Sequence, residues 1–81
     1  MDQDDARRII ENAIAKRREN FALSYLGGTP EGYTLKFRQG IVDIVRTRID
    51  DAVLADDARL GRLLDEVGRG LAALKSLKAL D

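Results

Sequence analysis

The sequence predicts an all-α fold, a small antiparallel three-helix bundle that associates with itself. Three segments carry apolar residues at helical spacing, at residues of about 5–26, 31–54 and 57–80. Between the first two, a Gly-Gly pair followed by Thr29, Pro30 and Glu31 is typical of one helix ending and the next beginning. With 81 residues, 44% apolar and 35% charged, the chain fits one soluble domain spanning residues 1–81.

The first expected helix, residues 5–26, has an apolar face and an acidic start, which suits the positive end of a helix dipole. The residues of that face are Ala6, Ile10, Ile14, Phe21 and Tyr25. A second interpretation makes residues 21–26 and 33–38 the arms of a β-hairpin, because residues 33–38 alternate apolar with polar side chains. We expect the helices, because Thr29 suits an N-cap and Pro30 suits the first helical position.

The second expected helix, residues 31–54, carries apolar side chains over an arc of about 200°, wider than contact with one neighbour requires. It should therefore be the central helix of the bundle. The third, residues 57–80, has a narrower stripe of leucines. The alternative is a helical hairpin in which the second and third helices are continuous. In that rod Asp56 would fall on the apolar stripe, so we expect a break there with Asp56 as an N-cap.

Several chemistries are excluded by composition, because the chain has no cysteine and no histidine. Disulfides, thiolate or imidazole metal ligands and Ser-His or Cys-His pairs are therefore impossible. The adjacent carboxylate pairs, such as Asp50 and Asp51, would point about 100° apart on a helix and would not converge on one ligand. We expect no enzymatic activity, no catalytic residue, no metal, no cofactor and no small-molecule substrate.

Charge gives little support for a polyanionic partner, since 14 basic residues balance 14 acidic ones and each third of the chain is itself balanced. Nucleic-acid binding is therefore not expected, although the basic segment Lys16-Arg17-Arg18 could support a nucleic-acid-associated regulator. No apolar run of about 18 residues exists, and the acidic start is unlike a signal peptide. We expect no membrane association and a cytoplasmic location.

Five residues are candidates for partner binding. Arg17 and Arg48 fall on apolar stripes, where their stems could lie on the core with the charge in water, or where they could meet carboxylates across an interface. Gly61, Gly68 and Ala72 form a strip of small residues beside the leucines of residues 57–80. With Gly70, this segment has three glycines in ten residues, and each of them lowers helix stability. Such a strip would let a second backbone approach closely.

The sequence therefore predicts a small protein–protein interaction module: an adaptor, a co-chaperone-like protein or a regulator that covers a surface of another protein. Its partner would be another protein or a second copy in a homodimer, because the glycine strip lies free in a single bundle. The alternatives are the nucleic-acid-associated regulator that uses Lys16 to Arg18 and a structural subunit of a larger assembly.

Overall fold

The computed structural model describes the backbone of residues 2–79, and all of their side chains except those of residues 42–47 and 75–79. It is a two-layer α/β fold, so the predicted all-α three-helix bundle and the alternative helical hairpin are both wrong. The elements in chain order are α1 (Gln3–Arg17), β1 (Ala22–Thr29), β2 (Gly32–Gln39), β3 (Val42–Ile49), α2 (Asp51–Leu54) and α3 (Asp57–Ala79).

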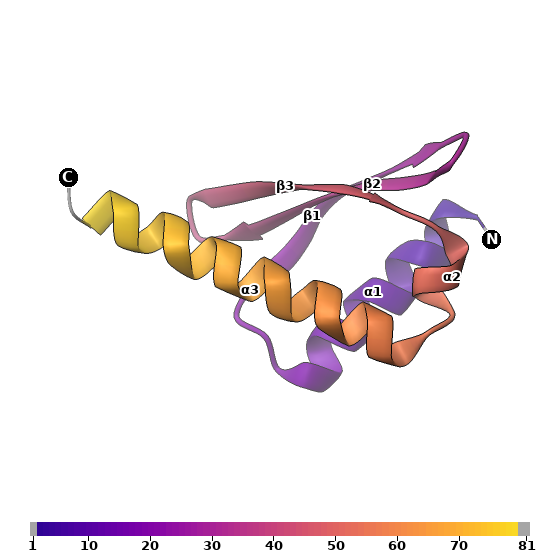
Figure 1. The fold of residues 1–81 in the computed structure, drawn as a ribbon, viewed down its shortest axis with the longest axis horizontal. Coiled ribbons are helices and arrows are strands. Elements are labelled where there is room, and N and C mark those ends of the chain that lie inside the picture. The colour runs from indigo at the N-terminus through magenta and orange to yellow at the C-terminus, as the bar shows by residue number, and fades with distance from the viewer. Residues whose placement is uncertain (1, 80–81) are drawn as a thin grey trace.

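The three strands form an antiparallel sheet in the order β1-β2-β3, so that β1 and β3 are its two edges. Figure 1 shows the helices gathered on one side of this sheet. In that layer α1 packs against β1, and α3 packs against β3 and β2. The opposite face of the sheet carries no helix within residues 2–79.

The segment 31–54, predicted as the central helix, instead forms β2, β3 and the short α2. In β2 the buried residues are Tyr33, Leu35 and Phe37, and the residues between them are exposed or half-buried. This is the period of two that places alternate side chains on one face of a strand. The hairpin interpretation of residues 21–26 and 33–38 was therefore the correct one.

The turns that join the strands explain why residues 27–31 were predicted as the end of one helix and the start of the next. Thr29 ends β1 and pairs with Gly32 at the start of β2, so Thr29 and Pro30 belong to a hairpin turn and not to a helix start. Gly32 has φ +149° and Gly40, in the β2–β3 turn, has φ +61°. Both values favour glycine, which has no Cβ to clash in these conformations.

The helix ends are set by local hydrogen bonds. The Asp5 N–H donates to the Asp2 carboxylate at the start of α1, and α1 ends at Arg17, well short of the predicted residue 26. The third expected helix corresponds to α3, although residue 80 lies outside the described residues. The backbone N–H groups of residues 58 and 59 donate to the Asp56 carboxylate, which confirms the predicted cap and the break before α3.

One apolar core lies between the sheet and the helices, and both layers contribute to it. Phe21 and Phe37 meet edge to face, with ring centroids 5.7 Å apart. The largest of the fully buried side chains are Phe37, Ile10, Leu35, Leu64, Leu71 and Val67. No described residue that is polar or charged is buried. Across residues 2–79, the helices are too short or too polar to span a bilayer.

Candidate functional site

A groove runs between α1 and the first turns of α3, with a volume of about 540 Å³. It is lined by residues of these two helices, namely Ile9, Asn12, Ala13, Lys16 and Arg17 of α1 and Asp57, Leu60 and Gly61 of α3. We call it the α1–α3 groove. It brings together two of the residues that the sequence marked for partner binding, Arg17 and Gly61.

The floor of the groove is apolar. Ile9 and Ala13 lie one helical turn apart on α1 and are only partly buried, while Leu60 of α3 is buried beside them. Asn12, Lys16 and Asp57 on its rim are exposed. An apolar floor with a few polar groups at the rim is the usual construction of a binding groove.

Gly61 keeps this groove open at the side of α3. A Cβ atom built on Gly61 would lie 3.2 Å from Nη1 of Arg17, closer than most van der Waals contacts. The glycine therefore leaves room for the Arg17 guanidinium to cross from α1 to α3. The cost of a glycine in the helix interior, about 1 kcal/mol relative to alanine, has a local structural reason here.

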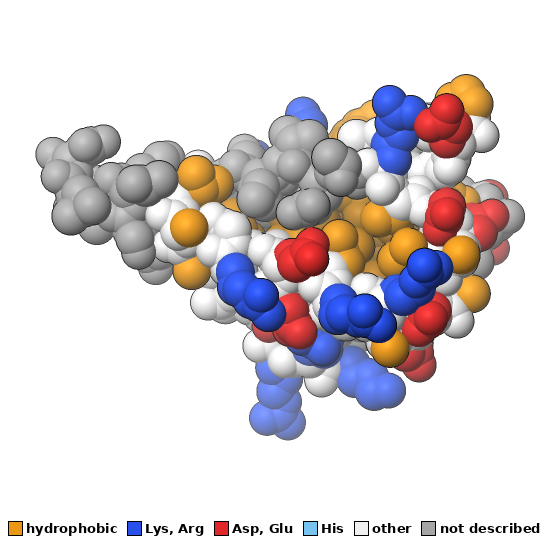
Figure 2. All heavy atoms as spheres, in the orientation of Figure 1, with side chains coloured by type: hydrophobic (Ala, Val, Ile, Leu, Met, Phe, Trp, Pro, Cys, Tyr) orange, Lys and Arg blue, Asp and Glu red, His pale blue; other side chains and the backbone are white. Residues whose placement is uncertain are grey.

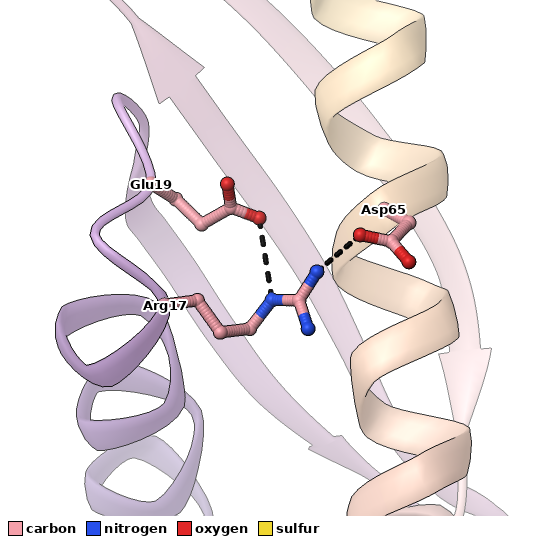
Figure 3. A network of polar contacts seen from close by, with 3 residues as sticks. All are labelled: Arg17, Glu19 and Asp65. Atoms are coloured by element: carbon pink, nitrogen blue, oxygen red, sulfur yellow. Dashed lines mark hydrogen bonds and ion pairs between the residues drawn. The ribbon is translucent and has the colours of Figure 1, made fainter.

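Arg17 closes one end of the groove through two ion pairs (Figure 3). Its Nη2 donates to Oδ1 of Asp65 in α3, and its Nε lies 3.4 Å from Oε2 of Glu19 in the loop before β1. The Arg17 and Asp65 side chains remain 36% and 46% exposed, so solvent screens the pair and its contribution is about 1 kcal/mol or less. The contact fixes how α1 ends against α3.

The other predicted site residues lie apart from the groove. A Cβ atom on Gly68 would meet the Phe21 ring at 3.7 Å, an ordinary contact, and Ala72 is exposed. Arg48 pairs with Glu31 of the β1–β2 turn at 2.6 Å, between two exposed side chains. Both arginines thus meet carboxylates of their own chain. Contact of any of the five residues with a second chain stays a prediction.

A second and larger hollow, about 730 Å³, lies where the β1–β2 turn, α2 and the start of α1 meet. Four carboxylates line it, those of Asp2, Glu31, Asp50 and Asp51. Asp2 and Asp50 accept backbone hydrogen bonds at helix starts, and Glu31 pairs with Arg48. Within the described part of the chain no three acidic residues are placed to hold a metal ion. The acids of this hollow serve the local structure.

Tyr33 forms part of the same hollow. Burial raises the pKa of the Tyr33 phenol above its usual value, and the Asp51 carboxylate, which accepts a hydrogen bond from the hydroxyl, raises that pKa further. The neutral phenol is therefore the form that the fold favours. This arrangement links the start of β2 to α2 and offers no activated nucleophile at neutral pH.

The outer face of the sheet carries Tyr25, whose side chain is 48% exposed. Its ring lies over Gly27, where any side chain would collide with the phenol group, and Nζ of Lys36 stands 5.6 Å from the ring centroid. The ring therefore covers a glycine within an edge strand, a known way to stabilise such a position. Its exposure has a structural explanation.

The basic segment at residues 16–18 does not form one charged surface. Arg17 is engaged with Asp65 and Glu19, and Arg18 is the left-handed residue that ends α1, with φ +55°. Lys16 lines the α1–α3 groove. This division weakens the nucleic-acid interpretation, which needs several cations on one face.

Comparison with protein families, with curated proteins and with solved structures finds no match to this chain. Sequence reasoning missed Asp65 and the groove residues Ile9 and Ala13. One signal was present for Asp65: it lies between Gly61 and Gly68 on the same flank of α3, where Arg17 of a neighbouring helix could reach it.

Proposed function

We propose that this protein is a protein-interaction module whose α1–α3 groove binds a short amphipathic segment of another protein. The observation that carries the proposal is the apolar floor of Ile9, Ala13 and Leu60 beneath a polar rim. Its volume of about 540 Å³ falls within the range of about 300–1,000 Å³ that binding sites occupy. An amphipathic helix that lays apolar anchors into such a groove is a recurrent mode of recognition.

The charges of the groove indicate the chemistry of its occupant. Arg17 is neutralised by two carboxylates, and Asp57 lies in the first turn of α3, where the helix dipole stabilises it. Among the described residues Lys16 has no ion-pair partner. The segment we propose therefore carries apolar side chains together with an acidic residue that reaches Lys16.

A cytoplasmic location and the lack of catalytic activity belong to the same proposal. Nothing in the fold depends on an oxidising compartment, because the chain has no cysteine. Binding in the groove needs no cofactor.

Selection from a phage-displayed library of random peptides tests the proposal. We expect peptides with apolar residues three or four positions apart and a nearby Asp or Glu, which bind the wild type in fluorescence anisotropy. Ala13→Glu, which puts a charge on the groove floor, should abolish binding. Lys16→Glu should weaken it about three- to tenfold.

The matched control is Arg62→Glu, an equal charge change on an exposed position of α3 outside the groove. It should bind as the wild type does. Failure to enrich any peptide, or binding that both groove variants leave unchanged, would contradict the proposal.

A further inference from the structure

The β3 strand leaves a free edge on the molecule. It is the last strand of the sheet, and within residues 2–79 its only strand neighbour is β2. Backbone N–H and C=O groups on its other side are therefore unpaired by the sheet, over eight residues or about 26 Å. Its sequence contains no proline and no lysine, two residues that commonly protect an edge strand from pairing, and its charged residues are Asp43, Arg46 and Arg48.

One apolar flank of α3 lies on the same side of the molecule as the β3 edge. The other flank of α3, which carries Gly61 and Gly68, faces Arg17 and Phe21. We call it the glycine flank. At about 100° per residue, Leu63, Gly70 and Leu74 fall on the flank turned away from α1. Since α1 lies under β1 and α3 under β3, this second flank is next to the free edge. We call it the leucine flank.

The leucine flank is not fully covered by its own chain. Leu63 and Leu74 are only partly buried, and Gly70 between them presents no side chain. Figure 2 views the molecule from this side and shows hydrophobic side chains in the band between α3 and the strands. Ile41, the residue before β3, is 87% exposed. Apolar groups therefore border the free edge at more than one point.

We propose that the β3 edge and the leucine flank of α3 form the interface of a homodimer. Two copies pair their β3 strands antiparallel across a two-fold axis, which gives a six-stranded sheet with all helices on one face. The same axis brings the two leucine flanks together beneath the paired strands. This surface is separate from the α1–α3 groove and does not depend on the function proposed for it.

A second copy fits this surface better than a peptide does. An edge strand is complementary to itself under two-fold symmetry, because its donors and acceptors meet their own counterparts. A lone peptide strand would present only alternate side chains to Leu63 and Leu74, whereas a second copy brings a whole helix with the same apolar flank. Arg59 and Glu66 border the leucine flank with opposite charges, so two copies meet there without net repulsion.

Sedimentation equilibrium of the full chain at tens of micromolar tests the proposal. We expect a mass of about 18 kDa, twice that of the 9.0 kDa chain. Leu74→Glu should raise the dimer dissociation constant more than about tenfold. Its matched control is Ala72→Glu, two residues away on the glycine flank, which should remain a dimer.

A variant at an exposed position guards against loss of folding. Ile41→Glu touches no buried group, so it should fold as the wild type does in circular dichroism while it weakens the dimer. A monomeric wild type would overturn the proposal, as would a dimer that both Leu74→Glu and Ile41→Glu leave intact. Loss of the dimer in Ala72→Glu alone would assign the interface to the glycine flank instead.

Discussion

The two edge strands of the sheet have the same length but differ in their protection. In β1 a bulge between Leu23 and Tyr25 interrupts the register, and two glycines precede the turn at Pro30. The Tyr25 ring covers Gly27, and α1 packs against this strand. Bulges, proline and covering elements are the means by which proteins keep an edge from pairing.

The β3 strand also packs against a helix, α3, but its sequence contains no proline and no glycine. Its one register irregularity lies toward Ile49, and the pairing from Gln39–Val42 to Leu35–Arg46 is regular. The exposed Ile41 precedes it, and the leucine flank of α3 lies beside it. On the proposal made above, this difference makes β3, and not β1, the edge that pairs with a second copy.

Truncation of a core side chain in the central strand should have the largest effect, because β2 pairs with both edge strands. Phe37 is fully buried and contacts the Phe21 ring. Phe37→Ala should lower the free energy of unfolding by about 3–5 kcal/mol, since it leaves a cavity in the shared core. Urea denaturation measures this, with Tyr25→Ala on the outer face as the mild counterpart. A loss below about 1 kcal/mol for Phe37→Ala would contradict the described core.

The two hairpin turns should differ in their tolerance of substitution. A Cβ atom on Gly32 would collide with the Ile49 carbonyl at the end of β3, and φ is +149° there. Gly32→Ala should therefore cost about 2–3 kcal/mol. Gly40 has open space around it and φ +61°, a value that asparagine tolerates, so Gly40→Asn should cost less than about 1 kcal/mol. Thermal unfolding of the pair checks the comparison, and equal losses would argue against it.

Alkaline pH should reveal the contact of β2 with α2. The pKa of Tyr33 is raised by burial and by Asp51, so the folded state favours the neutral phenol. The stability from this contact is complete below the usual tyrosine pKa of about 10 and is lost as pH rises above it. Tyr33→Phe should remove this additional loss. Parallel urea midpoints against pH for the two proteins would exclude the effect.

The smallest effects should come from the two arginine pairs. A double-mutant cycle on Arg17 and Asp65 should give a coupling of about 0.5–1 kcal/mol, because these side chains are partly shielded between helices. The cycle on Arg48 and Glu31, whose side chains are 62% and 74% exposed, should give less than about 0.5 kcal/mol. A larger coupling at the exposed pair would reverse the expected order.

The start of α3 could be predicted from the sequence because a cap is local. Asp56 as an N-cap and a helix from residue 57 follow from a few neighbouring residues and agree with the structure. The strands could not be found by the same approach. In β1 the bulge puts Leu23 and Leu26 on the core side although they are three residues apart, a spacing that resembles a helix. In β2 strict alternation was visible, but the Thr-Pro-Glu turn was taken as a helix start.

The α1–α3 groove shows the limit of sequence reasoning for the site. Arg17 and Gly61 were each singled out, and the place of Arg17 on an apolar stripe left two interpretations open, one of which paired it with a carboxylate across an interface. The identity of that carboxylate, Asp65, depends on two helices that the chain brings together across 48 residues. This contact depends on the sheet against which both helices pack, and the all-helical prediction contained no sheet.

The most direct test of the difference between the two edges is amide hydrogen exchange, measured residue by residue at low and at high micromolar protein. We predict that the outward amides of β3 become more protected as concentration rises, because β3 pairs with a second copy. The outward amides of β1 should exchange at the same rate at both concentrations. Protection that rises at β1, or rates at β3 that do not depend on concentration, would contradict the account.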